Sequence, residues 1–148
     1  MRVGSKGRYA VIALVDVAMN SASRPVSLAE VAERQQISLS YLEQLFAMLR
    51  KAGLVVSSRG PGGGYRLQRP GDEITVGEVF RAVEETGNAE NNGRDWSGGA
   101  TAGLWQALDD HIREFLEGVA ITDVISGKVK GVFANGSTVE VERGLSAT

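Results

Sequence analysis

The stretch SSRGPGGGYRL, Ser57 to Leu67, places four glycines and a proline between an arginine and a tyrosine. It does not match a phosphate-binding loop, because no Lys-Ser or Lys-Thr pair follows the glycines and Tyr65 stands where a dinucleotide motif needs its third glycine. A linker is excluded as well, since the flanking runs LVVSS and YRLQ are typical of short strands. We therefore expect a β-hairpin whose tip carries Arg59.

Two helices joined by a short turn are predicted directly before this hairpin. Ser27 and Glu30 have the spacing of a capping box, in which each side chain bonds an unpaired backbone N–H of the first turn. The helix that they start runs to about Gln35, and a turn at 36–37 follows. Two helices with so short a connection are typical of a helix-turn-helix.

The next helix starts near Ser38 or near Ser40, and the second choice would pair Ser40 with Glu43 in another capping box. Gly53 ends the helix, and the first strand of the hairpin follows at once. Its predicted buried stripe repeats at helical spacing and consists of Leu42, Leu45, Phe46 and Leu49. A helix-turn-helix followed by a hairpin has the element order of a winged helix.

Further helices flank this unit. Residues 5–20 are densely apolar and predict a largely buried helix, and Thr75 with Glu78 caps a helix whose stripe continues to Val83. Residues 104–119 predict an amphipathic helix, and Thr122 could cap one more short turn. The fold class is therefore mainly α with a small β-hairpin wing. The tail, 127–148, alternates like a strand but shows no evident partner, so we expect it to be flexible.

Composition restricts the possible functions. The 148-residue chain has no cysteine and one histidine, His111, which excludes disulfides, thiolate metal sites and cysteine nucleophiles. Without a membrane-length apolar run or a signal-peptide pattern, we expect a cytoplasmic protein with no membrane partner. Residues 1–70 hold ten Lys or Arg against four acids, a charge of +6, whereas 71–148 hold six against fourteen, a charge of −8. A basic first half favours a polyanion as its partner, although chance clustering of solvated charges remains the alternative.

The sequence resembles the iron-sulfur cluster regulators, the IscR-type bacterial transcription factors. The resemblance lies in SKGRYAV, LVDVA, VSLAEVAERQQISLSYLEQLF, LRKAGLV, SSRGPGGGYRL and VGEVFRAVEET, which cover most of residues 4–86. It implies a homodimer whose two winged helices bind a pseudo-palindromic double-stranded DNA operator and repress or activate transcription, with contact to RNA polymerase as a possibility. It also implies four parts: a DNA-binding domain at 1–86, a loop at 87–103, a dimerisation helix with a short turn at 104–126, and the tail.

From the pattern and the resemblance together we predict two sets of site residues. The open side of the third helix offers hydroxyl, amide, acidic and basic groups suited to base edges and phosphates, although an ordinary solvated face would look similar. The predicted dimer interface, turned inward, consists of Leu104, Trp105, Leu108, Ile112, Phe115 and Val119. The predicted DNA-binding residues are Arg2, Ser38, Ser40, Tyr41, Glu43, Gln44, Arg50, Lys51, Arg59, Gly60, Pro61, Gly62, Gly63 and Tyr65.

The chain departs from this family in the loop at 87–103. The family's sensor form binds a [2Fe-2S] cluster there through three cysteines and a nearby histidine. In this chain Asn92, Gly99 and Ala102 stand at such positions, and the loop looks shorter. Either this member does not sense through a cluster or its ligands have been replaced deliberately; as the sequence stands, we expect no cofactor.

Two other classes of function are weaker alternatives. An enzyme is disfavoured because no nucleophile–base arrangement is present, and Glu84 and Glu85 are neighbours that point apart on a helix. A winged helix that docks a protein would not need Arg50, Lys51, Arg59, Arg66 and Arg69 together. We therefore predict a DNA-binding regulator, with a different sensed signal as the main alternative within that class.

Overall fold

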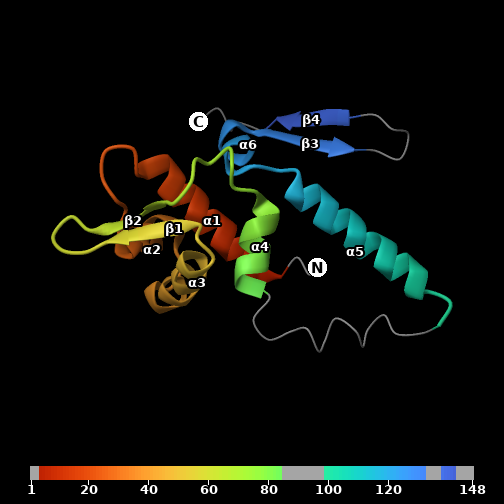
Figure 1. The fold of residues 1–148 in the computed structure, drawn as a ribbon, viewed down its shortest axis with the longest axis horizontal. Helices are drawn as coiled ribbons and strands as arrows, with labels where there is room; N and C mark the ends of the chain where they lie inside the picture. The colour runs from red at the N-terminus through yellow and green to blue at the C-terminus, as the bar shows by residue number, and fades with distance from the viewer. Residues whose placement is uncertain (1–3, 85–98, 133–137, 143–148) are drawn as a thin grey trace.

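A computed structural model describes residues 4–84, 99–132 and 138–142. The mostly helical order and the first hairpin are those predicted, with a second hairpin at the C-terminal end (Figure 1). None of the described helices combines the length and the apolar character needed to cross a membrane. The elements are α1 (Ser5–Asn20), α2 (Leu28–Gln35), α3 (Leu39–Lys51), β1 (Val55–Ser58), β2 (Gly64–Leu67), α4 (Val76–Glu84), α5 (Ala102–Glu117), α6 (Ile121–Ser126), β3 (Lys128–Val132) and β4 (Thr138–Glu142).

The helix-turn-helix is formed by α2 and α3. Its first cap is the predicted box, in which the Glu30 backbone N–H donates to Ser27 Oγ at 3.2 Å and the Ser27 N–H donates to Glu30 Oε2 at 2.9 Å. The turn is made at Gln36, whose φ of 55° reverses the chain after α2. Of the two possible starts of α3, Ser38 is the cap, because its Oγ accepts from the Tyr41 N–H at 3.3 Å. Glu43 is therefore not a capping partner of Ser40.

The core lies between α1, α3 and α4. The predicted stripe of α3 is fully buried. In the stripe of α4, Val79 and Val83 are fully buried, and Val76 and Phe80 are 7% and 3% exposed. The prediction that α1 is largely buried is wrong, because only one side of it faces the core. Its other side leaves 41% of Tyr9, 40% of Ile12 and 53% of Met19 exposed.

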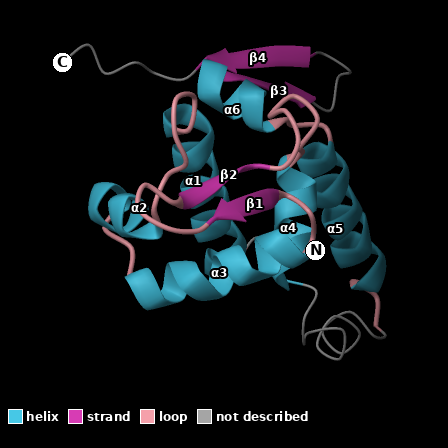
Figure 2. Ribbon diagram, turned by 60° about the vertical axis from the view of Figure 1, so that its left-hand side comes forward, coloured by secondary structure: helices cyan, strands magenta, loops and turns pink. Residues whose placement is uncertain are grey.

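The wing is a two-stranded antiparallel hairpin in which Val55 pairs with Leu67 and Ser58 with Gly64 (Figure 2). A single bridge from outside the hairpin adds to it: Val26 N–H donates to Tyr65 O at 3.0 Å, and Tyr65 N–H donates to Val26 O at 2.7 Å. Because Val26 directly precedes the capping box of α2, this bridge connects the wing to the start of the helix-turn-helix.

Helix α4 packs closely on α1. At Gly7 an added Cβ would lie 2.4 Å from the Phe80 ring, so only glycine permits this approach. Glu84 Oε1 accepts from the Gly7 N–H at 3.1 Å and thus caps α1 from a position 77 residues away. The sequence interpretation argued that Glu84 and Glu85 do not form a catalytic pair. In the structure, Glu84 caps α1.

The chain returns to the core after α5. Val76 N–H donates to Val119 O at 2.8 Å, and Ile121 N–H donates to Ile74 O at 2.9 Å, so this segment pairs with the chain that leads into α4. The end of α5 is held by Glu117, which forms an ion pair with Arg81.

The C-terminal part differs from the sequence prediction at two points. The residue that caps α6 is Asp123, whose Oδ2 accepts from the Ala120 N–H at 2.9 Å, and not Thr122. The strand-like alternation of the tail has its partner within the tail, because β3 pairs antiparallel with β4 from Lys128↔Glu142 to Val132↔Thr138. The sequence contains a hairpin signal for this pairing that our interpretation did not use, the Asn-Gly dipeptide at 135–136 between the two runs.

Candidate nucleic-acid interface

The outer side of α3 is exposed along its whole length. Leu39, which the sequence interpretation did not select, is 42% exposed at the first helical position beside the cap. Ser38 Oγ and Ser40 Oγ lie 3.0 Å apart, so the two hydroxyls share one hydrogen bond at the N-terminal end. The other exposed residues of this side are Glu43, Gln44, Ala47, Arg50 and Lys51.

The polar side chains on this side are available to a ligand. Among the described residues, none forms a hydrogen bond or ion pair with the side chain of Glu43, Gln44, Arg50 or Lys51. A glutamine can pair with adenine through two hydrogen bonds, whereas a glutamate accepts from cytosine and repels phosphate. The basic pair at the C-terminal end of α3 suits the phosphate backbone.

The wing tip presents Arg59 on a narrow glycine-rich turn. Gly60 and Gly62 have φ values of 93° and 74°, which residues with a Cβ rarely adopt. The Gly63 N–H closes the turn by donating to Gly60 O at 2.9 Å. Arg59 is exposed and has no partner among the described residues, and the tip carries no bulky side chain beside it.

The two tyrosines predicted to bind DNA are partly buried and pack within the chain. The ring of Tyr65 lies 4.9 Å from that of Phe46, which fixes the wing to α3. The ring of Tyr41 meets Tyr9 edge-on at 5.8 Å, and burial raises the pKa of Tyr41. The structure thus gives both rings a supporting role under the exposed surface. Arg2 lies outside the described residues.

An ion pair between a buried carboxylate of α1 and an exposed arginine of α2 sets the position of α2 on α1. Asp16 on α1 is buried and accepts from Arg34 Nε at 3.0 Å, from Arg34 Nη2 at 2.7 Å and from Gln35 Nε2 at 2.8 Å. Burial alone would raise the pKa of Asp16, but the hydrogen bonds from Arg34 and Gln35 outweigh it and lower that pKa. Sequence reasoning missed this cluster, because Asp16 occurs in an otherwise apolar helix and its partners are 18 and 19 residues away.

Several of the arginines counted in the basic half are neutralised within the chain. Besides Arg34, Arg24 pairs with Glu30 at 2.6 Å and holds the pKa of that carboxyl at about 2. Arg69 pairs with Glu78 at 2.8 Å. It is therefore not part of the free basic surface, although the sequence analysis grouped it with Arg50, Lys51, Arg59 and Arg66. The exposed bases that remain beside the wing and α3 are Arg50, Lys51, Arg59 and Arg66.

Helix α5 has an apolar side that the described part of the chain leaves largely exposed. Leu104 is 60% exposed, Leu108 49%, Phe115 43% and Trp105 36%, while Ile112 is half-buried. Within the part of the chain that the structure describes, these residues are therefore not turned inward. Val119 is different: it lies beyond the end of α5 and is only 5% exposed in the chain's own core, so it is not available to a partner.

The donor set does not fit an iron-sulfur cluster. Such a cluster needs thiolates, with at most two histidines, and the chain has no cysteine. Ala102, at the family's histidine position, is the first residue of α5, and Gly99 has no side chain; Asn92 lies outside the described residues. His111 lies on α5 with its Nδ1 2.9 Å from Ala107 O. Within the described ranges, no group of three or more His, Cys, Asp or Glu side chains could hold a metal ion.

An exposed second helix of a helix-turn-helix, next to a hairpin with a free arginine at its tip, defines a winged-helix DNA-binding protein. The family model described as "Rrf2: Iron-dependent Transcriptional regulator" matches residues 3–127. The chain belongs to the Rrf2 family of transcription regulators, and it is not an enzyme. The fold class and the regulatory function predicted from the sequence are confirmed.

The chain is similar to curated regulators over most of its length. It is 48% identical over 140 residues to the HTH-type transcriptional regulator IscR of Cereibacter sphaeroides, covering 88% of this chain and 90% of that one. It is 52% identical over 130 residues to the regulator of the same name from Vibrio cholerae, covering 84% and 75%.

The chain is also similar to solved structures of regulators with the same fold. T. potens IscR matches with a TM-score of 0.71 and 40% identity, covering 84% of this chain and 86% of that one. The oxidised form of CymR from Staphylococcus aureus matches with a TM-score of 0.70 and 32% identity, covering 84% and 95%.

Proposed function

We propose that the chain binds a pseudo-palindromic operator as a homodimer and regulates transcription without an iron-sulfur cluster. The observation that carries this proposal is the pairing of two free surfaces at one end of the molecule, the outer side of α3 and the Arg59 wing tip, away from α5 (Figure 1). The proposed place of action is the cytoplasm, and contact with RNA polymerase would accompany activation at some sites.

In the proposed complex, α3 enters the major groove and the wing enters the neighbouring minor groove. Ser40, Glu43 and Gln44 then face base edges, and Arg50 and Lys51 reach phosphates. The tip is narrow enough for a minor groove, whose negative potential attracts the unpaired Arg59. Glu43 contributes mainly by exclusion, because a carboxylate is repelled by phosphate and accepts a hydrogen bond only from selected bases.

Selection from random DNA tests this function. The purified protein should enrich two inverted half-sites whose centres lie about one helical turn, ~10 base pairs, or a multiple of it, apart. Footprinting should then show protection of both half-sites at the same protein concentration. Failure to enrich any sequence would contradict the proposal, and enrichment of a single half-site would contradict its dimeric form.

The proposed dimer is formed through α5. An exposed apolar stripe on a long helix is typical of an interaction surface, because isolated apolar side chains gain from mutual burial. Leu108→Glu should convert the dimer to a monomer in sedimentation equilibrium, whereas Gln106→Glu on the opposite side of the same helix should not. Both variants should keep their helical circular dichroism, since the described part of the chain does not bury either side chain.

The proposed independence from a cluster has its own test. The names of the relatives and the family description suggest a role in iron or iron-sulfur homeostasis, which this chain would serve through its DNA affinity alone. Anaerobic reconstitution with iron and sulfide should leave the protein colourless and its operator affinity unchanged. A stable visible band with about one cluster per subunit, lost in His111→Ala, would overturn this part of the proposal.

A further inference from the structure

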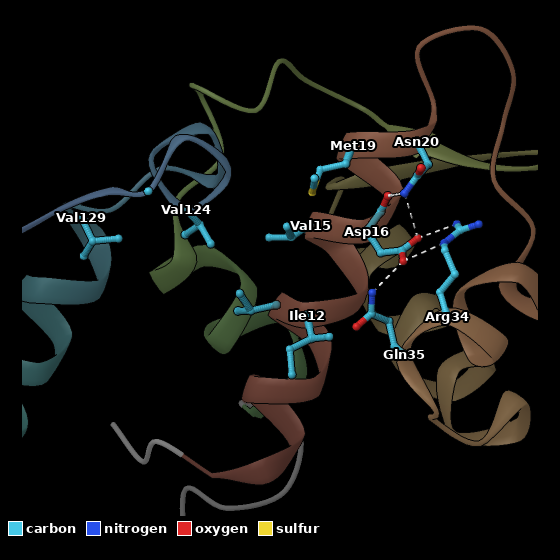
Figure 3. A pocket seen from close by; sticks show the side chains of 11 residues that line it. Ile12, Val15, Asp16, Met19, Asn20, Arg34, Gln35, Val124 and Val129 are labelled. Atoms are coloured by element: carbon cyan, nitrogen blue, oxygen red, sulfur yellow. Dashed lines mark hydrogen bonds and ion pairs between the residues drawn. The ribbon is translucent and has the colours of Figure 1, made fainter. Parts of the chain in front are cut away.

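A groove of about 750 Å³ crosses the exposed side of α1 (Figure 3). At one end it is bounded by Val124 of α6 and Val129 of β3, and at the other by Arg34 and Gln35 of α2. Its floor is the α1 side that carries Val11, Ile12, Val15 and Met19. The volume falls in the range of small-molecule sites, roughly 300–1,000 Å³, which combine apolar walls with a few placed polar groups.

The polar end of the groove presents hydrogen-bond acceptors. The ionised carboxylate of Asp16 can only accept hydrogen bonds. Gln35 must therefore turn its Nε2 toward the carboxylate and its Oε1 away from it. Asn20 likewise uses Nδ2 to donate to Asp16 O at 2.8 Å, which leaves its Oδ1 free to accept. Among the described residues neither amide oxygen has a partner, and the chemistry of Asp16 fixes both orientations.

The charge of this end is balanced. Asp16 and Arg34 form a close pair with two hydrogen bonds, 3.0 and 2.7 Å, so the groove has no net charge with which to attract an anion. We propose that the groove binds a small molecule with an apolar body and an N–H or O–H donor at one end, such as an aromatic alcohol or amine. The apolar body would lie over Ile12, Val15 and Met19, and the donor would reach the amide oxygen of Gln35, the nearer of the two to Ile12 (Figure 3).

The position of the groove gives such binding a route to the DNA surface. Its polar end belongs to α2, the first helix of the helix-turn-helix, and its apolar end belongs to α6, which follows α5 in the chain. A bound molecule would contact both at once. The site would therefore supply this regulator with a signal that does not depend on a cluster.

Methyl-detected NMR with three matched probes tests the proposal. Phenethyl alcohol and phenethylamine share their apolar body with phenylacetate, but only the first two carry a donor when the acid is ionised. The alcohol and the amine should saturably shift the methyl signals of Ile12, Val15 and Met19. Phenylacetate should bind about tenfold more weakly or not at all, because it leaves the amide oxygen of Gln35 unpaired.

Two variants locate the binding. Ile12→Trp should fill the groove and weaken binding of phenethyl alcohol by about tenfold, while Val56→Trp on the wing should not change it. The two positions are comparably exposed, 40% and 44%, so both variants should fold. The proposal is overturned if the probes shift other methyl groups, if phenylacetate binds as well as the alcohol, or if the groove signals respond to protein concentration and not to probe. The last result would assign the groove to a second copy of the chain.

Discussion

Replacing Gly64 by alanine should detach the wing from the start of the helix-turn-helix. A Cβ at this position would lie 2.3 Å from Val26 O and 2.4 Å from Val26 C, and these are backbone atoms that cannot rotate away. The segment at Val26 and strand β2 must therefore separate, which breaks the hydrogen bonds of 3.0 and 2.7 Å between Val26 and Tyr65.

The expected cost is about 3 kcal/mol of unfolding free energy. Each lost backbone hydrogen bond contributes about 1 kcal/mol net, and loosened packing of Val26, which is 1% exposed, adds about 1 more. Urea unfolding followed by circular dichroism measures this as a lower midpoint at unchanged slope, with all samples at one protein concentration because the proposed dimerisation would shift apparent stability.

Gly103→Ala is the matched control. Gly103 lies within α5, and an added Cβ there would meet nothing within 4 Å. The same chemical change should therefore be neutral or stabilise the protein by up to about 1 kcal/mol, because alanine is the better helix former. If Gly64→Ala unfolds within about 0.5 kcal/mol of the unchanged protein, the steric argument is refuted.

Three further predictions concern DNA binding and acid stability. Arg59→Ala should weaken operator binding by about 1–3 kcal/mol in fluorescence anisotropy, and a change of less than about twofold would leave Arg59 as a solvated turn residue. Glu43→Ala should broaden the set of sites recovered from random DNA more than it weakens the best site, and an unchanged preference would remove Glu43 from base readout. Asp16→Asn should lower the unfolding free energy at about pH 7 by about 2 kcal/mol and flatten its decline on acidification. The lowered pKa of Asp16 means that its contribution is present above the ordinary carboxyl pKa and lost as the pH falls through the lowered value, so parallel pH profiles would contradict this.

Local signals predicted most of the winged helix. The capping boxes at Ser27 and Thr75 and the helical spacing from Leu42 to Leu49 involve neighbours within one or two turns, and the structure has each of them. Hairpin geometry likewise depends on the glycines between two short strand-like runs. These elements were predictable because the interactions that define them are close in sequence.

Contacts between distant residues were not predictable. The cap that Glu84 provides for Gly7, the clamp of Asp16 on Arg34 and the bridge between Val26 and Tyr65 join segments whose sequences carry no mark of one another. Charge counting failed for Arg69 for the same reason, since its pairing with Glu78 appears only in three dimensions. The exposed side of α1 was misjudged because apolar density does not reveal which side of a helix has a neighbour.

The return of the chain to the core at Val119 and Ile121 has a consequence for how this architecture can be modified. These residues complete the winged helix by pairing with the segment before α4, so the described winged helix is discontinuous in sequence, and α5 is inserted between its two parts. An insertion of this kind can change its length, its chemistry or its partner without disturbing the reading surface, because its two ends are fixed by the host. The architecture is therefore modular: one DNA-binding body can accept different sensing segments, and grafting such a segment between Glu84 and Val119 is the natural way to give this regulator a new input.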